Sequence, residues 1–545
     1  LKMASSVVCA VILCFIAVGQ CLDPPVFNQP YRLRGVIQLP YAEIVEPILA
    51  FFDPANNRSR VDYYDGIQRT VQFGSVPGLP YGAELKVIPF STQTVYNQLS
   101  CFQVNGTQDS PAGITTVLPD LTGFVFLGEQ VLNGRRVNAF QSVVVNGKKT
   151  STYTFWSSIP ENNPVRYEMM GYDSLLGSHF DKYYVDYLAF ESPAQFSNDD
   201  FAVPTNLTCG NFPGPGNSHT SKILMNPIRE YVHHHDHHVH ESFEMFKKTH
   251  KRQYTIDEHD SRKHVFRQNL RYIHSKNRAG LSYTLGVNHL TDKTEKEMKK
   301  MRGYRYTHGD RGGQKFSLGA LRVKDAPDQW DWRLMGAVTP VKDQAICGSC
   351  WSFGTTGTIE GAYFLKSGNL VRLSQQELVD CSWGYGNNGC DGGEDFRSYQ
   401  YLIQNGGLTS EDQYGQYLAI DSFCKSKLVK PVVQLANYTL LPQGDLGALK
   451  IALFAQGPIS VGIDASHKSF GFYANGVYYE PDCKNDPDSL DHAVLAVGYG
   501  NIGGQNYWLV KNSWSTYWGN DGYILMSQTN NNCGVATAAS YVTVK

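Results

Sequence analysis

A cysteine, a histidine and an asparagine near the C-terminus have the residue types of a nucleophilic site. Cys350 directly precedes residues 351–365, which have helical spacing and end at Ser367-Gly368. We expect Cys350 to lie at the N-terminus of this helix, where free N–H groups and the helix dipole stabilise a thiolate. The thiolate, rather than the thiol, is the nucleophile in cysteine chemistry. The pattern therefore predicts covalent catalysis by Cys350.

His492 is the candidate base for this thiol. Residues 326–545 contain two histidines, and the other, His467, lies in a polar stretch typical of an exposed loop. His492 begins a strand-like run that is followed by a glycine-containing turn and a second strand. A hairpin centred near Ile502 places Asn512 opposite His492. An amide at that position accepts the second imidazole N–H and fixes the orientation of the ring.

The number of cysteines in residues 326–545 is odd, so they cannot all pair within that region. A leftover cysteine in a secreted chain indicates an intermolecular bridge or a reactive thiol. A redox pair is the alternative for Cys347 and Cys350, but the βαβ pattern of a thioredoxin-like motif is absent around them. The seven cysteines are Cys347, Cys350, Cys381, Cys390, Cys424, Cys483 and Cys533.

Residues 241–277 have a helical period with two stripes. An ordinary amphipathic helix explains the apolar members of the second stripe but not its asparagines. This stripe resembles the propeptide signature of cathepsin-L-like cysteine proteases, and Gly286 to Asp292 resembles the motif that follows it, with Leu290 where phenylalanine is usual. The resemblance implies an inhibitory, I29-like propeptide over 241–325. The stripes are Phe243, Phe246, His250 and Tyr254, then Glu258, Arg262, Val265, Phe266, Asn269, Ile273 and Asn277.

Residues 326–545 resemble the papain-like cysteine protease domain. The resemblance rests on Cys-Gly-Ser-Cys-Trp ending at Trp351, on Asp491-His492-Ala493 and on Asn512-Ser513-Trp514. It implies an α+β fold with a helical lobe and a β-barrel lobe. It also implies that Cys350 is the nucleophile, that His492 is the acid–base and that Asn512 orients the imidazole.

Further roles follow from the same resemblance. Gln344 and the backbone N–H of Cys350 are expected to form the oxyanion hole. The expected chemistry needs no cofactor and no metal. The implied bridges, Cys347–Cys390, Cys381–Cys424 and Cys483–Cys533, leave Cys350 free.

The substrate groove can also be assigned by resemblance. Gly392 and Gly393 match the strand that pairs with extended substrate backbone, where the missing side chains permit close approach. Glu394 and Asp395 follow where the family commonly has apolar residues. Two carboxylates there can attract Arg or Lys at P2, and the alternative is that both point to solvent. Small apolar residues at the S2 positions suit a bulky apolar side chain at P2, and these residues are Gly462, Leu490 and Ala538. The remaining groove residues are Asp491 and Trp514.

Residues 20–210 read as an antiparallel β-rich domain, a barrel or a sandwich. Apolar or alternating runs at 124–127, 137–145 and 151–156 are separated by Asn133-Gly134 and Asn146-Gly147, which supply the positive φ of hairpin turns. No catalytic constellation occurs in this domain. Cys101 and Cys209 can form one disulfide there. A ligand-binding barrel that targets the protease is one interpretation of the domain.

The N-terminal 19 residues read as a secretory signal peptide. Residues 211–240 read as a linker with a histidine-rich tract, more typical of a solvated segment than of a metal site. The expected compartment is the secretory pathway, ending in a lysosome, a granule or outside the cell. The later chain contains no apolar run long enough for a membrane span. Four glycosylation sequons agree with export, at Asn57, Asn105, Asn206 and Asn437.

Charge is unevenly divided along the chain. The net charge of −2 argues against nucleic-acid binding. Residues 231–325 carry 20 basic and 11 acidic side chains and 12 of the 16 histidines, whereas 326–545 carry 13 basic and 20 acidic ones. The basic segment therefore attracts the acidic region at neutral pH. Acidification protonates carboxylates of residues 326–545, which weakens this attraction, and charges the histidines of the segment, which adds self-repulsion. We therefore expect a latent zymogen that is released autocatalytically below about pH 5–6 by cleavage near 321–328.

Two further expectations concern the activity and the partners. The activity is predicted to be that of an endopeptidase on protein and peptide substrates, and the alternative is a dipeptidyl-type exopeptidase whose N-terminal domain blocks the groove. The layout of the chain resembles the two-subunit haemocyte proteinases of insects. By that resemblance, the N-terminal domain stays bound as a second subunit after cleavage.

Overall fold

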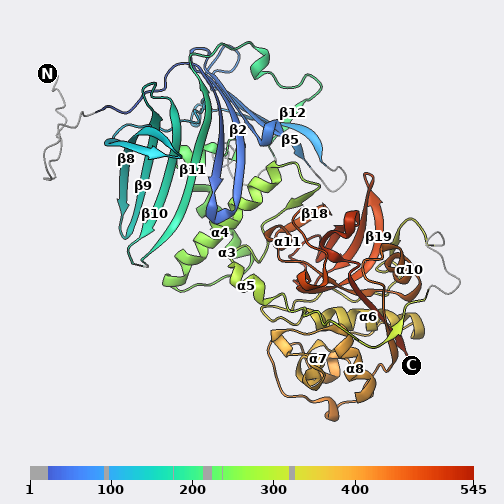
Figure 1. Ribbon diagram of the computed structural model, residues 1–545. Coiled ribbons are helices and arrows are strands. Elements are labelled where there is room, and N and C mark those ends of the chain that lie inside the picture. Colours follow the sequence, from blue (N-terminus) through green and yellow to red (C-terminus); the bar gives the residue numbers. More distant parts are fainter. Residues whose placement is uncertain (1–21, 91–96, 176, 213–223, 236, 318–325) are drawn as a thin grey trace, which may run out of the picture. The chain divides into compact units, whose positions relative to one another are not determined.

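The computed structural model describes residues 22–90, 97–175, 177–212, 224–235, 237–317 and 326–545 (Figure 1). The signal-peptide prediction, residues 213–223 of the predicted linker and the predicted cut at 321–325 fall outside these residues. The chain divides into two compact units, residues 1–87 with 101–235 and residues 88–100 with 236–545.

The first unit is built on one 12-stranded sheet, in the order β12-β6-β5-β4-β3-β2-β1-β11-β10-β9-β8-β7. All described pairings are antiparallel except β12 with β6, so the β-rich prediction is confirmed. It is a single continuous sheet rather than a pair of packed sheets. Its strands are β1 (Tyr31–Leu39), β2 (Ile44–Asp53), β3 (Arg58–Tyr63), β4 (Gln68–Phe73), β5 (Ala83–Phe90), β6 (Gln98–Asn105), β7 (Val125–Leu132), β8 (Arg135–Asn146), β9 (Lys149–Ser158), β10 (Pro164–Asp173), β11 (Ser178–Glu191) and β12 (Cys209–Asn211).

Turn chemistry explains part of this sheet. Asn133 and Gly134 both have positive φ and form the two-residue loop between β7 and β8. The second hairpin differs from the expectation, because Asn146 still pairs with Lys149 and Gly147 is the first loop residue. A disulfide joins Cys101 of β6 to Cys209 of β12.

Residues 224–235, which the sequence placed in a linker, pack against the first unit instead. The amide of Asn226 accepts a hydrogen bond from Tyr63 Oη (2.6 Å) and donates one to Gln72 Oε1 (2.9 Å). Arg229, in helix α2 (Ile228–Val232), pairs with the buried Glu84 at 2.9 Å. The inward side chains of the sheet are polar here, and residues 224–235 supply partners for Tyr63, Gln72 and Glu84, which holds this segment in place.

The histidine-rich tract is correspondingly not a single solvated segment. His233 Nε2 lies 2.8 Å from the carbonyl oxygen of Thr116, and the His234 ring lies 4.6 Å from that of Tyr153. His238 is buried in the next helix. The tract therefore divides between the two units, and burial lowers the pKa of His233.

The second unit begins with what we call the propeptide segment, residues 237–317. Asn269 donates to the carbonyl oxygen of Thr291 (2.9 Å), and Asn277 exchanges two 2.8 Å hydrogen bonds with the backbone of Leu285. The asparagines of the second stripe thus hold the chain that follows the helix. The elements are α3 (His237–Thr249), α4 (Ile256–Arg278), β13 (Tyr283–Leu285), α5 (Glu295–Lys300) and β14 (Gln314–Lys315).

Residues 326–545 form a helical part and a sheet part, which confirms the α+β prediction (Figure 1). The sheet order, including two propeptide strands, is β13-β18-β21-β20-β19-β17-β22-β16-β14, and β15 also pairs with β19. The helices are α6 (Cys350–Ser367), α7 (Gln375–Cys381), α8 (Asp395–Asn405), α9 (Glu411–Tyr414), α10 (Leu446–Gln456) and α11 (Lys468–Gly471). The strands are β15 (Trp330–Asp331), β16 (Leu435–Leu440), β17 (Ile459–Ile463), β18 (Tyr473–Tyr478), β19 (His492–Ile502), β20 (Gln505–Lys511), β21 (Tyr523–Ser527) and β22 (Ala538–Val544).

Three glycines let helix α6 approach the sheet closely. A Cβ on Gly354 would lie 2.7 Å from Ser460 Oγ, and one on Gly357 would lie 2.6 Å from Leu495 Cδ2. A Cβ on Gly361 would lie 2.5 Å from Pro458 Cδ. This face holds the first residue of α6 near the beginning of β19. The helix ends as predicted, at Gly368 in the left-handed conformation.

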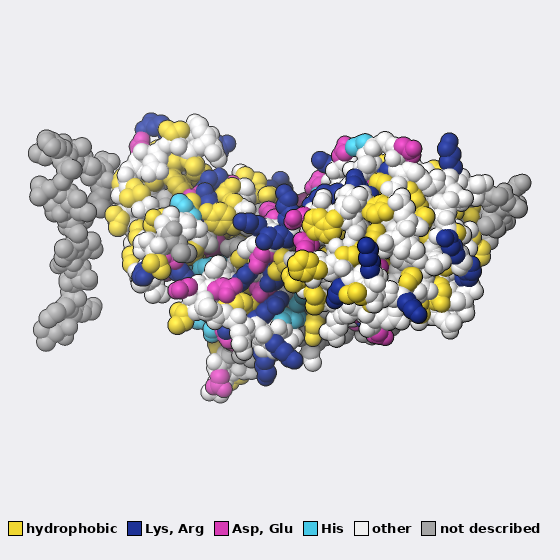
Figure 2. All heavy atoms as spheres, turned by 90° about the horizontal axis from the view of Figure 1, so that it is seen from below, with side chains coloured by type: hydrophobic (Ala, Val, Ile, Leu, Met, Phe, Trp, Pro, Cys, Tyr) yellow, Lys and Arg dark blue, Asp and Glu magenta, His cyan; other side chains and the backbone are white. Residues whose placement is uncertain are grey.

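Charge on the propeptide segment is locally paired. Arg262 contacts both Glu258 (3.0 Å) and Glu297 (2.7 Å). Lys247 pairs with Glu244 at 2.8 Å. Basic and acidic side chains are accordingly intermixed on the face shown in Figure 2. Part of the positive charge of the segment is therefore paired with acidic side chains of the same segment.

Candidate functional site

The Cys350 side chain contacts the backbone of the residue that follows His492. Cys350 is the first residue of α6, and its Sγ accepts a 3.4 Å hydrogen bond from the N–H of Ala493. His492 is the first residue of β19. Both side chains are fully buried. The structure therefore places the Cys350 thiol against the backbone at the beginning of the strand that carries His492.

Asn512 contacts His492 as expected, but not through the predicted register. The hairpin turns at Gly503-Gly504, and the ladder of β19 with β20 ends at the pair Leu495 and Lys511. The strand partner of His492 is Ile463 on β17. Asn512 lies just beyond the end of the ladder, and its Oδ1 lies 2.8 Å from His492 Nε2. The prediction of direct cross-strand pairing was wrong, because the turn is centred between Gly503 and Gly504 rather than at Ile502, and the bulge between Ala496 and Gly498 shifts the register by only one residue.

The same contact defines the histidine tautomer. Asn512 Oδ1 also accepts the N–H of Ser513 at 2.8 Å, so the Nε2–H of His492 is the donor in their bond. His492 Nδ1 has no hydrogen-bond partner among the described residues and is free to take a proton. The Trp514 ring lies 4.8 Å from the imidazole and excludes water from the bond.

Gln344 is held rigidly beside Cys350. Its Nε2 donates to the carbonyl oxygens of Met301 and Cys347, both at 2.8 Å. Its Oε1 accepts the hydroxyl of Ser513 at 2.6 Å, which fixes the amide with its N–H₂ group toward the site. The sequence did not identify Ser513 in this role, although it lies within the Asn512-Ser513-Trp514 run.

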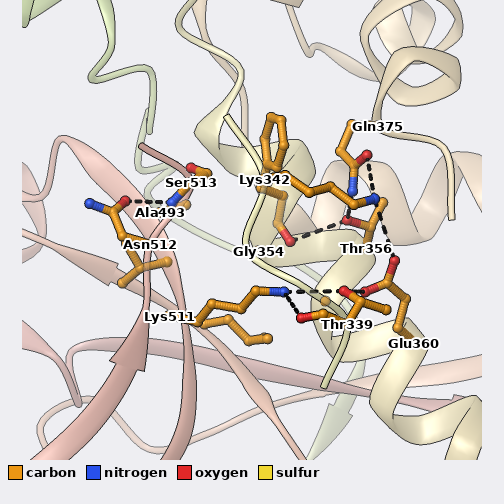
Figure 3. A pocket seen from close by; sticks show the side chains of 14 residues that line it. Thr339, Lys342, Gly354, Thr356, Glu360, Gln375, Ala493, Lys511, Asn512 and Ser513 are labelled. Carbon is orange, nitrogen blue, oxygen red and sulfur yellow. Dashed lines mark hydrogen bonds and ion pairs between the residues drawn. The ribbon is translucent and has the colours of Figure 1, made fainter. Parts of the chain in front are cut away.

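A buried ionic network lies beneath Asn512 and Ser513 and lines a cavity of about 20 Å³ (Figure 3). Lys511 Nζ donates to the carbonyl oxygen of Thr339 at 2.7 Å, and the Thr339 hydroxyl donates to Glu360 at 2.7 Å. Burial lowers the pKa of Lys511 to about 8. These bonds tie the end of β20 to α6 and hold the backbone that carries Asn512.

The propeptide segment closes the site. The N–H of Gly303 donates to Cys350 Sγ at 3.3 Å. The carbonyl oxygen of Gly303 accepts the N–H of Gly393 at 2.8 Å, and Gly393 in turn accepts the N–H of Arg305 at 3.1 Å. Tyr304 N–H donates to the carbonyl oxygen of Asp491 at 2.9 Å. Gly393 and Asp491, both expected to bind substrate, therefore hold propeptide backbone.

The protonation states reflect this closure. Burial raises the pKa of the Cys350 thiol to about 11 and lowers the pKa of His492 to about 4. Both groups are therefore neutral at physiological pH. The thiolate expected at the helix tip is absent from this closed form, because desolvation outweighs the hydrogen bonds from Gly303 and Ala493.

The side chain of Tyr304 fills the predicted S2 pocket. It is 2% exposed and shares a core with Leu490 and Ala538. A Cβ on Gly462, which pairs with Ala538, would lie 2.9 Å from Tyr304 Cε1. The sequence missed residues 301–305 as the segment that enters the groove, because no periodic pattern distinguishes them.

Glu394 and Asp395 do not point to solvent. Glu394 is 0% exposed and Asp395 is 3% exposed. Glu394 Oε1 lies 3.4 Å from the Tyr304 hydroxyl and 3.1 Å from Arg311 of the propeptide segment. A Cβ on Gly392 would lie 2.7 Å from the Gly303 carbonyl oxygen, so the backbone approach expected at Gly392 occurs with the propeptide segment.

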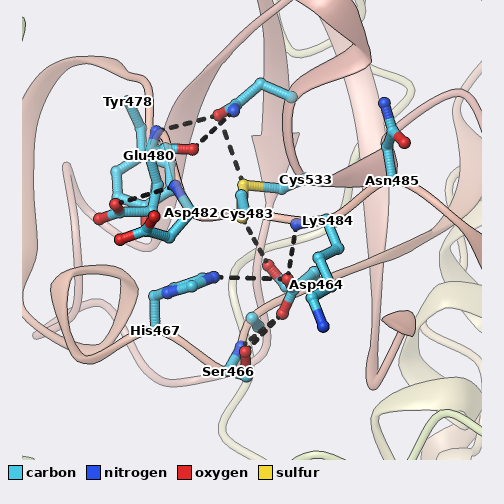
Figure 4. The surroundings of a disulfide bond; sticks show 12 residues. Asp464, Ser466, His467, Tyr478, Glu480, Asp482, Cys483, Lys484, Asn485 and Cys533 are labelled. Atoms are coloured by element: carbon cyan, nitrogen blue, oxygen red, sulfur yellow. Dashed lines mark hydrogen bonds and ion pairs between the residues drawn. A yellow bond between two sulfur atoms is a disulfide. The ribbon is translucent and has the colours of Figure 1, made fainter. Parts of the chain in front are cut away.

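Disulfide bonds join Cys347–Cys390, Cys381–Cys424 and Cys483–Cys533, and Cys350 is the free cysteine among the described residues. Asp464, His467 and Cys483 have potential metal-ligand atoms within 4.8 Å of one another. The sulfur of Cys483 is already bonded to Cys533, and Asp464 pairs with His467 at 3.4 Å (Figure 4). This group is an ion pair beside a disulfide, and it lacks the thiolate that a metal would need.

Comparisons with known proteins agree with this geometry. Residues 326–543 match the papain family cysteine protease profile, and 243–298 match the cathepsin propeptide inhibitor domain (I29). Digestive cysteine proteinase 1 of Homarus americanus is 49% identical over 56% of this chain and 94% of its own length. Cathepsin L2 of Homo sapiens is 44% identical over 55% of this chain and 91% of its own length.

Solved structures give the same result. The digestive procathepsin L2 proteinase from the midgut of Tenebrio molitor larvae is 38% identical, with a TM-score of 0.52 over 56% of this chain and 99% of that one. No helix among the described residues is long and apolar enough to cross a membrane. The chain therefore belongs to the papain family of cysteine proteases, as a cathepsin L-like peptidase preceded by its inhibitory propeptide domain.

Proposed function

We propose that the chain is a latent endopeptidase in which Cys350 is the nucleophile, His492 the acid–base and Asn512 the residue that orients the imidazole. The observation that carries this proposal is the sulfur at the start of α6, bonded to Ala493 N–H and closed off by Gly303 N–H. The sulfur faces an amide N–H rather than a carbonyl carbon. The closed form therefore cannot begin the reaction on its own propeptide.

In the open groove, His492 Nδ1 takes the proton of the Cys350 thiol. The sulfur attacks the scissile carbonyl carbon, and the C–N bond breaks as His492 returns the proton to the leaving amine. Water, deprotonated by His492, then attacks the thioester. The C–S bond breaks, the acid product leaves and Cys350 regains its proton. The departure of the propeptide segment removes the burial that keeps both groups neutral in the closed form.

Gln344 Nε2 and the backbone N–H of Cys350 are proposed to stabilise the oxyanion. The position of the Met301 carbonyl oxygen, 2.8 Å from Gln344 Nε2, supports this role. Replacing Ser513 by alanine removes the hydroxyl that orients the amide. We expect kcat to fall about 5- to 10-fold, the equivalent of roughly one hydrogen bond, with KM little changed. Steady-state kinetics on the processed enzyme measures this, and a change in KM alone would contradict the role.

The path of the propeptide segment supports endopeptidase activity. Met301 contacts Gln344, and Gly303 contacts Cys350. Further along the segment, strand β14, which ends at Lys315, pairs with β16. The groove of residues 326–545 thus accommodates a continuous chain. A quenched peptide blocked at both ends tests the proposal. We expect internal cleavage, whereas cleavage confined to dipeptides from free N-termini would favour the dipeptidyl alternative.

We propose that acidification opens the closed form through His250 and His289. Their rings lie 6.4 Å apart, and both pack on Tyr517 of the protease part at 5.1 and 6.0 Å. Arg252 and Lys293 are positive groups nearby, and Asp292 is the opposing carboxylate. Burial lowers the pKa of both histidines, that of His289 to about 3.

The lowered pKa values of His250 and His289 determine how the stability of the closed form changes with pH. Histidines whose pKa is lowered in the closed form stabilise that form above their ordinary pKa of about 6.5, and the stabilisation is lost as the pH falls below that value. Asp491 and Glu394 act oppositely, because burial raises their pKa values to about 6 and about 7. Of the two groups in the charge argument, the histidines therefore carry the proposed acid response, and the buried carboxylates Asp491 and Glu394 oppose it.

A double substitution tests this response. In a Cys350→Ala proenzyme, His250→Gln with His289→Gln should slow cleavage by added active enzyme about 3- to 10-fold at pH 5, with little change at pH 7. His240→Gln is a matched control, because His240 is exposed and its ring contacts Lys263 of the propeptide segment itself. Processing rates from pH 4 to 7 measure the effect. Equal slowing at every pH would show that the rings matter only for packing.

We further propose that residues 20–210, together with the docked strap 224–235, stay associated with the protease as a second subunit in the secretory pathway. The hydrogen bonds of Asn226 and Arg229 support keeping the strap with the first unit. The exposed sequons Asn105 and Asn206 fit glycan attachment. At Asn57 the amide nitrogen is already bonded to the carbonyl oxygen of Ser75, and Asn437 is half-buried.

A further inference from the structure

We propose that the S2 subsite recognises a cationic P2 side chain, the guanidinium of arginine or the ammonium of lysine, through Glu394 and Asp395. The proposal rests on the peptidase function proposed above and names the substrate class for that same groove. It goes beyond the apolar preference that Gly462, Leu490 and Ala538 indicate.

The closed form already holds a cation at this subsite. Arg311 of the propeptide segment lies 3.1 Å from Glu394 Oε1, and the carboxylate is entirely buried. The same guanidinium lies 4.6 Å from the centre of the Tyr306 ring and 5.9 Å from that of Phe396. The subsite thus combines a buried carboxylate with an aromatic face, which suits a planar cation.

Tyr304 shows how far a P2 side chain reaches. Its backbone pairs with Asp491 and its ring fills S2, so that its hydroxyl lies 3.4 Å from Glu394 Oε1. An extended arginine side chain is about as long as tyrosine and ends where this hydroxyl lies. Asp395, which is 3% exposed, adds a second buried carboxylate beside Glu394. Burial raises the pKa of the Tyr304 hydroxyl, and the charges of Asp395 and Glu394 raise it further.

Departure of the propeptide segment removes two partners of Glu394 at once. Oε1 loses both Tyr304 and Arg311, whereas the ion pair of Oε2 that remains among the described residues is with Arg397, at 3.8 Å. The Asp395 carboxylate retains the Ser540 hydroxyl as a donor. A buried carboxylate whose remaining ion pair is long is costly to keep charged, and a P2 cation restores a close contact. A P2 leucine cannot restore this contact, so the pocket should favour arginine or lysine over leucine at P2.

Paired peptide substrates test this inference. Two fluorogenic substrates that differ only in arginine or leucine at P2 should be cleaved by the processed enzyme with kcat/KM values within about tenfold of each other. Glu394→Gln should lower the arginine-to-leucine ratio about tenfold, and Asp395→Asn should lower it less. Asp412→Asn, which removes one exposed carboxylate from α9, should leave the ratio unchanged.

The possible results distinguish failure of this inference from failure of the proposed function. A ratio unaltered by Glu394→Gln, or a native enzyme that rejects P2 arginine by more than about 100-fold, overturns the inference. The second result needs no variant, so poor folding of Glu394→Gln cannot leave the question open. Failure to cleave either substrate, or cleavage that survives Cys350→Ala, would instead refute the proposed function.

Discussion

Replacing Cys350 with alanine is expected to lower the kcat of the processed enzyme by at least about 10⁴-fold. The variant lacks the sulfur that must form the thioester, while His492, Asn512 and Gln344 stay in place. Only the oxyanion donors and substrate binding remain to assist attack by water, and these account for a small residual rate. Hydrolysis of a fluorogenic peptide, followed over hours with inhibitor-titrated native enzyme as the standard, measures the loss.

The matched control for this variant is a neighbouring hydroxyl. Ser352 is also buried in α6, and its hydroxyl bonds to the carbonyl oxygen of Ser349 at 2.8 Å. Ser352→Ala should cost stability but keep the chemistry, so kcat should stay within about threefold. Retention of more than about 1% of native activity by Cys350→Ala would assign the nucleophile elsewhere.

Replacing Gly303 with valine is expected to abolish latency. A Cβ at this position would lie 1.7 Å from the carbonyl oxygen of Gly348 and 2.7 Å from its Cα. Gly348 cannot move away easily, because its N–H bonds to the carbonyl oxygen of Cys390 at 2.8 Å and the Cys347–Cys390 disulfide flanks it. Residues 303–305 must therefore leave the groove.

The loss can be estimated from the contacts that residues 303–305 make. Three backbone hydrogen bonds at about 1 kcal/mol each and burial of the Tyr304 ring at about 2 kcal/mol suggest that closure weakens by 10²- to 10³-fold or more. The measurement is hydrolysis of a small peptide by the uncleaved proenzyme at pH 7. His240→Val, which adds the same side chain at an exposed position of the segment, should remain latent. Unchanged latency of Gly303→Val would show that another segment blocks the groove.

Local signals in the sequence predicted much of the site. The glycine stop at Gly368 and the helical spacing before it fixed α6, and the cysteine pattern indicated a free Cys350. The asparagine stripe indicated side chains with bonding roles, and Asn269 and Asn277 have them. These features depend on contacts close in sequence or on simple pairing rules.

The features that the sequence could not predict depend on long-range packing. The bulge between Ala496 and Gly498 changes the register, yet Asn512 still reaches His492, because the chain leaves the ladder at Lys511. Burial of Glu394 requires Arg311, which lies 83 residues earlier in the chain. The docking of Asn226 against Gln72 likewise joins distant segments across the first unit.

One measurement tests the central claim most directly, namely that Cys350 is the nucleophile and that residues 303–305 keep it closed. The full-length chain and the processed enzyme are each treated with an epoxysuccinyl thiol inhibitor at pH 5 and pH 7, and the modified residue is mapped by mass spectrometry. We predict that the label enters Cys350 of the processed enzyme at both pH values and is absent from the intact chain at pH 7. Rapid labelling of Cys350 in the intact chain at pH 7, or labelling of a different residue in the processed enzyme, would contradict the claim.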